Sequence, residues 1–187
     1  MHSAEHRALR ELFAAARHLR DHWGSLAGRL GDAAAAEALR AGADDVRGLL
    51  LELRDAAAAR DLYGRPAAQG VGVNLAGVRR VVTDRFLERN QALRFAALDV
   101  VHVVTLLRYI GELARRRGDA DLAALCDRWA QRMGAHEAAA RDAVVALAQD
   151  PDVAIEPLDP SPAGRAAHAV ANAVGTVGEW VDRRAQR

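Results

Sequence analysis

The sequence lacks several residue types and motifs on which particular functions depend. Cys126 is the only cysteine, so an intramolecular disulfide cannot form and a cysteine-based metal site is not expected. The chain has no glycine-rich phosphate loop, no nucleophile elbow and no dinucleotide-binding fingerprint. No class of enzyme is indicated by a motif, which favours a non-enzymatic role.

Signals for membrane insertion or export are also missing. The longest apolar stretch, residues 95–110, is interrupted by Asp99, His102 and Arg108, which argues against a membrane span. Residues 1–6 contain no apolar signal core. We therefore expect a cytoplasmic protein with no membrane partner.

Lysine is absent, and all 26 basic residues are arginine. The formal net charge is nevertheless only +1, so bulk electrostatics give no reason to expect nucleic acid or a membrane surface as a partner. Arginine suits phosphate binding, but codon bias in a GC-rich genome explains both the arginine and the abundant alanine. No nucleic-acid function is predicted.

The composition is that of packed helices. Hydrophobic residues make up 51% of the chain and aromatic residues 4%, so alanine, leucine and valine must form the core, which favours helices over sheets. In residues 3–30, apolar side chains recur at steps of three and four, the spacing of helices in a bundle. These side chains are Leu9, Leu12, Ala16, Leu19, Trp23, Leu26 and Leu30. We predict an all-α fold built on a four-helix bundle.

Helix boundaries can be placed from capping residues and glycines. The expected helices span about residues 3–30, 32–63, 90–117 and 119–149. Only Gly31-Asp32 separates the first two, so they should form an antiparallel hairpin. A longer connection, with a short helix from Asn74, should cross over between the second and third. The expected N-terminal caps are Ser3, Asp32, Asn90 and Asp119.

Three regions follow from this pattern. Residues 1–150 form the bundle, with Trp23, Trp129 and Met133 expected to meet in its core. Residues 151–164 hold four of the five prolines and read as a linker. Residues 165–187 should form a fifth, amphipathic helix.

This order of helices, together with the stretch YIGELARRRGDADLAAL at residues 109–125, resembles the bacterial ferritin-like superfamily and its small stress-associated branch. The resemblance implies a ferritin-like four-helix bundle that commonly forms dimers. The metal site of that family takes a Glu from each of two helices and Glu-x-x-His from each of the other two. This sequence has no Glu-x-x-His: residues 43–48 supply no histidine, and Ala140 stands three positions after Glu137. Only Glu137 can be carried across, so the resemblance implies a bundle without the usual di-iron ligands.

Other polar groups are candidate metal ligands. Asp99 and His102 are three residues apart on one side of a helix, and His136 and Glu137 lie on the following helix. Together they would form a mixed nitrogen and oxygen shell suited to iron or manganese. In the alternative interpretation, Asp99 and His102 belong to a polar stripe, and His136 is a buried neutral imidazole bonded to a carboxylate.

His18 and His22 have the i, i+4 spacing that can chelate zinc. Relative to the apolar seam of their helix, one is expected on the surface and the other at the edge. The alternative is that both are surface histidines among charged neighbours. As a ligand, His18 or His22 would complete the mixed shell formed by Asp99, His102, His136 and Glu137.

Three functions stay open. The chain is a dimeric scaffold or stress-related binding protein, or a metal-dependent oxidase or metal carrier with a non-standard His/Asp/Glu site, or a small-ligand protein with a pocket between helices. Residues 95–110 are apolar around most of the helix, so we expect a homodimer with this helix near its interface. The C-terminal helix either folds back on the bundle or docks into a groove of a protein partner.

Overall fold

The protein is helical throughout the part that the structure describes. The computed structural model describes residues 2–30, 33–60, 87–170 and 184, and within them no strand is present. The elements are α1 (Ser3–Ala27), α2 (Ala33–Ala58), α4 (Arg89–Arg117), α5 (Ala120–Ala146), the 3-10 turn η3 (Leu147–Gln149) and α6 (Pro151–Ala154). The predicted all-α class is confirmed.

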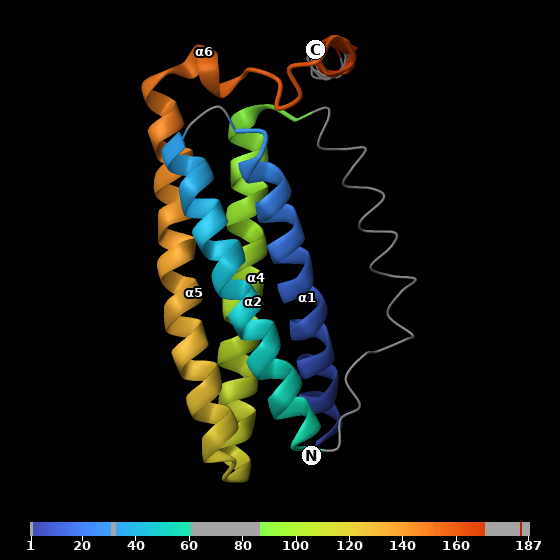
Figure 1. Cartoon of the computed structure of the whole chain (residues 1–187), viewed down its shortest axis with the longest axis vertical. Helices are drawn as coiled ribbons and strands as arrows, with labels where there is room; N and C mark the ends of the chain where they lie inside the picture. Colours follow the sequence, from blue (N-terminus) through green and yellow to red (C-terminus); the bar gives the residue numbers. More distant parts are fainter. Residues whose placement is uncertain (1, 31–32, 61–86, 171–183, 185–187) are drawn as a thin grey trace.

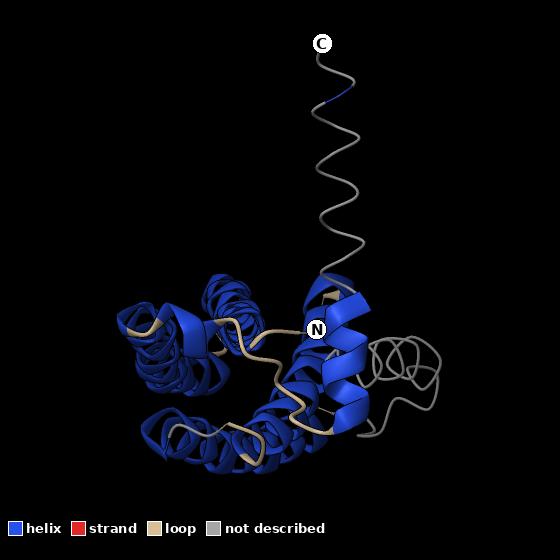
Figure 2. Ribbon diagram, turned by 90° about the horizontal axis from the view of Figure 1, so that it is seen from above, coloured by secondary structure: helices blue, strands red, loops and turns tan. Residues whose placement is uncertain are grey.

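The four long helices lie side by side (Figure 1). Helix α1 packs against α2 and α4, and α5 packs against the same two helices from the other side. In Figure 1, α1 and α5 run upward, whereas α2 and α4 run downward. Viewed from above, the described residues are helices joined by short loops (Figure 2). The short helix expected from Asn74 lies outside the described residues.

The boundary between α4 and α5 follows the prediction. Gly118 ends α4 with a φ of 78°, a left-handed conformation that glycine adopts without strain. Asp119 then caps α5 by accepting a hydrogen bond from the backbone N–H of Leu122 at 3.1 Å. Both roles were predicted from the dipeptide Gly118-Asp119, and both are confirmed.

Two other predicted caps differ. The Nδ1 atom of His2, not Ser3, accepts from the backbone N–H of Ala4 at 3.1 Å. Helix α4 begins at Arg89 with Glu88 as its N-cap residue, two positions before the expected cap Asn90. Asn90 lies in the first turn instead, where its amide donates to the carbonyl of Ala154 at 2.8 Å. Asn90 therefore bonds to the segment after α5 and does not cap its own helix. Asp32 lies outside the described residues.

The core contains the two central tryptophans in contact with glycines. Trp23, Trp129 and Met133 are buried in one continuous apolar cluster, as their positions on the seams predict. A Cβ atom on Gly42 would lie 2.2 Å from the Trp23 ring, and a Cβ on Gly48 would lie 3.1 Å from the Trp129 ring. The indole N–H of Trp23 donates to the carbonyl of Ala96 at 3.1 Å, which links α1 to α4.

The proline-rich segment after α5 is more ordered than a linker. Pro151 starts α6, whose cap Asp150 accepts from the backbone N–H of Val153 at 3.1 Å. The backbone N–H of Leu158 donates to the carbonyl of Leu87 at 2.9 Å, and the Leu158 side chain is buried. This segment therefore packs on the start of α4. Of the predicted fifth helix, residues 162–170 are helical, and most of the rest lies outside the described residues.

Helix α4 carries apolar side chains on its outer face as well as in the core. Phe95, Leu98 and Tyr109 are 49%, 60% and 49% exposed, while Leu106 is buried. The face turned away from the core is thus apolar at several positions. Within the residues described, no helix combines the length and apolar character that crossing a membrane requires.

Candidate metal centre

A histidine pair on α1 and a carboxylate on α4 converge on one point. The Nδ1 atom of His22 lies 2.6 Å from Oδ2 of Asp99, and the Nε2 atom of His18 lies 3.4 Å from the same oxygen. One potential ligand atom from each residue lies within 4.8 Å of the other two. Within the described residues this is the group whose side chains are close enough to share one cation.

Helix geometry explains the arrangement. His18 and His22 are four residues apart, so they project from the same side of α1 on successive turns. Their rings stack with centroids 5.8 Å apart and planes inclined by 23°. Asp99 faces them because α4 packs directly against α1. One turn before Asp99 on α4, the hydrogen bond from the Trp23 indole to the Ala96 carbonyl also links α1 to α4.

The site is partly shielded from water. The His22 side chain is 4% exposed, whereas those of His18 and Asp99 are 24% and 23% exposed. In the described part of the chain, Asp99 forms ion pairs with the two histidines and with no arginine. Two imidazoles and a carboxylate are nitrogen and oxygen groups of the kind that a divalent metal ion uses as ligands.

The structure separates the four residues that the sequence suggested as one shell. His102 lies on the exposed side of α4, where its Nε2 atom is 3.4 Å from Glu11. His136 lies 2.7 Å from Asp45, and Glu137 pairs with Arg141 one turn along α5. Asp99 is therefore not joined to His102, His136 or Glu137. It joins the two α1 histidines instead.

The expected exposure of the α1 pair is also corrected. His22 was placed at the edge of the apolar seam, yet it is buried because α4 covers that side of α1. The i, i+4 spacing places both histidines on one side of α1. The sequence does not show which helix faces them, since His22 and Asp99 are 77 residues apart in sequence.

A second histidine–carboxylate cluster joins α2 to α5. Asp45 accepts hydrogen bonds from Nε of Arg132 at 2.6 Å and from His136 at 2.7 Å. Burial raises the pKa of Asp45, but these hydrogen bonds outweigh burial and hold its pKa below the usual value. The Trp23 ring meets the His136 ring edge-on at a centroid distance of 6.4 Å. The predicted pairing of His136 with a carboxylate is thus observed.

The single cysteine is not a candidate nucleophile or ligand. Cys126 is buried, and burial together with the nearby charge of Asp127 raises the pKa of its thiol to about 12. The thiol is therefore protonated at neutral pH, as expected for a cysteine that packs as a small apolar residue.

The geometry of the α1–α4 cluster can be compared with that of a bound metal. Zinc binds imidazole nitrogen and carboxylate oxygen at about 2.0–2.2 Å, so neighbouring ligands of a tetrahedral ion lie about 3.3 Å apart. The 3.4 Å separation of His18 from Asp99 matches that spacing. The 2.6 Å separation of His22 from Asp99 is a hydrogen bond that must open by about 0.7 Å to admit an ion. Both separations from Asp99 are therefore compatible with a bound ion after a movement of about 0.7 Å at His22.

Comparisons with protein-family models, with curated proteins and with solved structures gave no match to this chain.

Proposed function

We propose that the protein binds one divalent transition-metal ion at His18, His22 and Asp99. The observation that carries the proposal is the convergence of both α1 imidazoles on one carboxylate oxygen without a competing arginine in the described residues. Two imidazoles and one carboxylate suit ferrous iron and zinc, and they leave coordination positions for water or a substrate. The proposed activity is the binding or carriage of a single metal ion, which keeps at least one coordination position that the protein does not fill.

The resemblance to the ferritin-like superfamily supports the helix arrangement on which this proposal depends. We take the long helices as a four-helix bundle of that kind, because α2 and α4 run in the same direction and a long connection separates them. The Glu-x-x-His pairs of a di-iron centre are missing from the sequence. A mononuclear site between α1 and α4 therefore takes the place of the di-iron centre in this proposal.

Metal binding can be tested directly on protein purified without a histidine tag. After treatment with a chelator, the protein is titrated with Zn²⁺, with Mn²⁺ and, under anaerobic conditions, with Fe²⁺. We expect one equivalent of Zn²⁺ or Fe²⁺ to bind. Elemental analysis measures the stoichiometry, and calorimetry measures the affinity.

Variants decide whether the proposed residues are the ligands. His22→Ala and Asp99→Asn should abolish stoichiometric binding, whereas His102→Ala should retain it. His102 is a matched control because it lies on the same helix as Asp99 and is 52% exposed. Binding well below one equivalent for every metal, or equal loss in the control, would reject the site and favour the non-metal scaffold.

A second proposed property is a homodimer formed through the outer face of α4. The observation in its favour is that Phe95, Leu98 and Tyr109 are exposed and that their spacing places all three on one side of the helix, with His102 between them. Apolar faces of this kind are commonly covered by another chain. Light scattering at micromolar concentration should give twice the monomer mass, and Leu98→Asp should halve it. A monomeric mass for the unaltered protein would remove this proposal.

A further inference from the structure

An open groove lies between α1 and α2, on the side of α1 away from His18 and His22. Its volume is about 560 Å³, within the range of small-molecule sites. The lining residues come from two turns of each helix and combine four arginines with three apolar side chains. They are Phe13, Arg17, Arg20, Arg47, Leu50, Leu51 and Arg54, and we call this surface the arginine groove.

The positive charges of the arginine groove are only weakly compensated. Arg20 pairs with the adjacent Asp21, which is 61% exposed, and Arg54 pairs with the adjacent Asp55, which is 72% exposed. Arg47 pairs with Asp44 at the surface. Such exposed pairs contribute little and exchange readily with water. A guanidinium has five N–H donors, so each of these arginines keeps donors for another anion.

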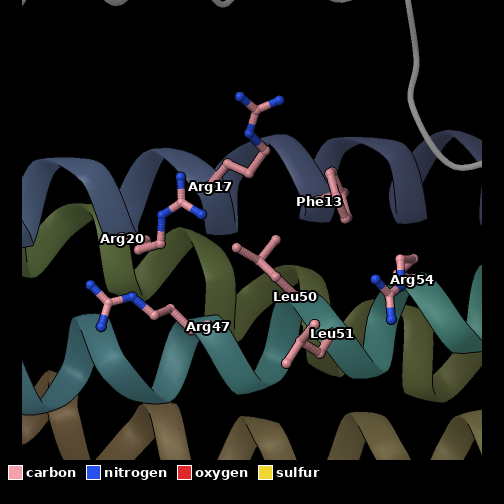
Figure 3. A pocket seen from close by; sticks show the side chains of 7 residues that line it. All are labelled: Phe13, Arg17, Arg20, Arg47, Leu50, Leu51 and Arg54. Atoms are coloured by element: carbon pink, nitrogen blue, oxygen red, sulfur yellow. The ribbon is translucent and has the colours of Figure 1, made fainter.

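Arg17 strengthens the positive charge. It is exposed on the outer edge of α1, and it has no ion pair among the residues described. Figure 3 shows Arg20 and Arg47 near one end of the groove, with Arg54 at the opposite end. An anionic group at the first end would meet two guanidinium groups from different helices, an arrangement suited to carboxylate or phosphate oxygens.

The floor between these ends is apolar. Leu51 is 55% exposed, although it belongs to the large apolar residues that usually lie inside. Phe13 projects from α1 toward α2, and Leu50 rises from α2 beside it (Figure 3). Both lie between the charged ends. The arginine groove thus presents a strip of hydrocarbon next to a pair of cations.

We propose that the arginine groove binds an anionic amphiphile, with its carboxylate or phosphate head at Arg20 and Arg47 and its alkyl chain on Phe13 and Leu51. The charge pair fixes the head and the apolar floor removes the chain from water. A nucleic acid or another polyanion would use the charges but gain nothing from the exposed leucine. A neutral apolar ligand would not use the guanidinium groups.

The proposal is tested by calorimetric titration of the full chain with monomeric ligands. Dodecanoate and dodecyl phosphate carry the two kinds of head, and comparison of their dissociation constants distinguishes a fatty acid from a phosphate ester. Inorganic phosphate and acetate carry the head alone, while dodecyl maltoside carries the same chain on a neutral head. We expect at least one anionic amphiphile to bind and the three controls to bind at least tenfold more weakly.

Chain length gives an independent readout. Each methylene buried in the arginine groove should tighten binding by up to about fourfold, so octanoate should bind more weakly than dodecanoate. Binding by none of the amphiphiles, or equal binding of dodecyl maltoside, overturns the proposal. Equal binding of inorganic phosphate also overturns it, because the apolar floor would then have no part.

Substitutions locate the binding. The double variant Arg20→Gln/Arg47→Gln and the single variant Leu51→Ser should each weaken binding of the anionic amphiphile by tenfold or more. Arg108→Gln is the matched control, since it removes one exposed arginine from α4. An equal loss in Arg108→Gln would show that net charge, not the groove, determines binding. Circular dichroism checks that each variant is folded, and these surface positions leave the core unchanged.

Discussion

Two carboxylates in this protein each meet histidine across a helix–helix contact, and their other partners differ. Asp45 on α2 is bonded to His136 and also to two guanidinium nitrogens of Arg132 on α5. Asp99 on α4 is bonded to His22 and lies near His18, with no arginine in the described part of the chain. The first cluster contains a permanent cation, whereas in the second, within the described residues, the carboxylate pairs with histidines alone.

This difference separates a structural ion pair from a candidate site. The charge of Asp45 is neutralised at every physiological pH, because arginine does not lose its proton, so the cluster holds α2 against α5. The guanidinium of Arg132 also lies 5.3 Å from the ring centre of Trp129, which ties the pair to the core. In the described part of the chain Asp99 has no arginine beside it, so its cluster is the candidate metal site.

Removing the Trp129 ring, which contacts the Arg132 guanidinium, should cause the largest loss of stability. Trp129→Ala should lower the free energy of unfolding by about 3–5 kcal/mol, because a buried indole leaves a cavity. Chemical denaturation measures this loss. The folded fraction should still bind metal at Asp99 if the two clusters are independent. Unchanged stability would contradict the buried position of Trp129.

The affinity for metal should distinguish the Asp99 cluster from the Asp45 cluster. Asp99→Asn should raise the dissociation constant for Zn²⁺ at least about 100-fold, since it removes a ligand, whereas Asp45→Asn should leave it unchanged. In the unaltered protein, metal at 100 times its dissociation constant should add about 2.7 kcal/mol to stability. Thermal unfolding with and without Zn²⁺ measures this increment. Equal sensitivity of both variants would mean that the clusters do not differ in function.

A substitution at Gly42, beside Trp23, should have a smaller effect on stability and tests the packing next to the Asp45 cluster. Gly42→Ala would place a methyl group 2.2 Å from the Trp23 ring, which contacts His136. We expect a loss of about 1–3 kcal/mol in unfolding free energy from this overpacking. Gly134→Ala is the control, because a Cβ there meets nothing within 4 Å. It should be neutral or slightly stabilising, because alanine favours helix. An unfolding midpoint for Gly42→Ala equal to that of the control would contradict this packing.

The smallest expected effect is the acid sensitivity of Asp45. The hydrogen bonds from Arg132 and His136 hold its pKa in the folded protein below the usual value of 3.8, so its pairing stabilises the fold above that pH. This stabilisation is lost as the pH falls from 3.8 through the lower folded pKa. Asp45→Asn should therefore reduce the change in urea midpoint between about pH 5 and about pH 3. Some acid sensitivity should persist, because a hydrogen bond from Arg60 also lowers the pKa of Asp119.

The helical class and several helix ends can be predicted from the residues alone. Apolar residues at steps of three and four define one buried side of α1, and they place Trp23 and Trp129 in the core. Gly118 and Asp119 end one helix and start the next through contacts within a few residues. These features depend on neighbours along the chain, so they can be read from it directly.

Which polar groups meet depends on how the helices pack against one another. The sequence allowed Asp99 to join His102 and His136, and it offered no reason to choose His18 and His22 instead. Asp99 meets His18 and His22 because α1 and α4 are neighbours and each helix is rotated so that these side chains face the other helix. A different neighbour or a different rotation would place the same side chains in solvent. The same packing left Leu51 on the surface beside four arginines. Contacts between residues far apart in sequence are fixed by how whole helix faces exclude water, and local spacing does not encode them.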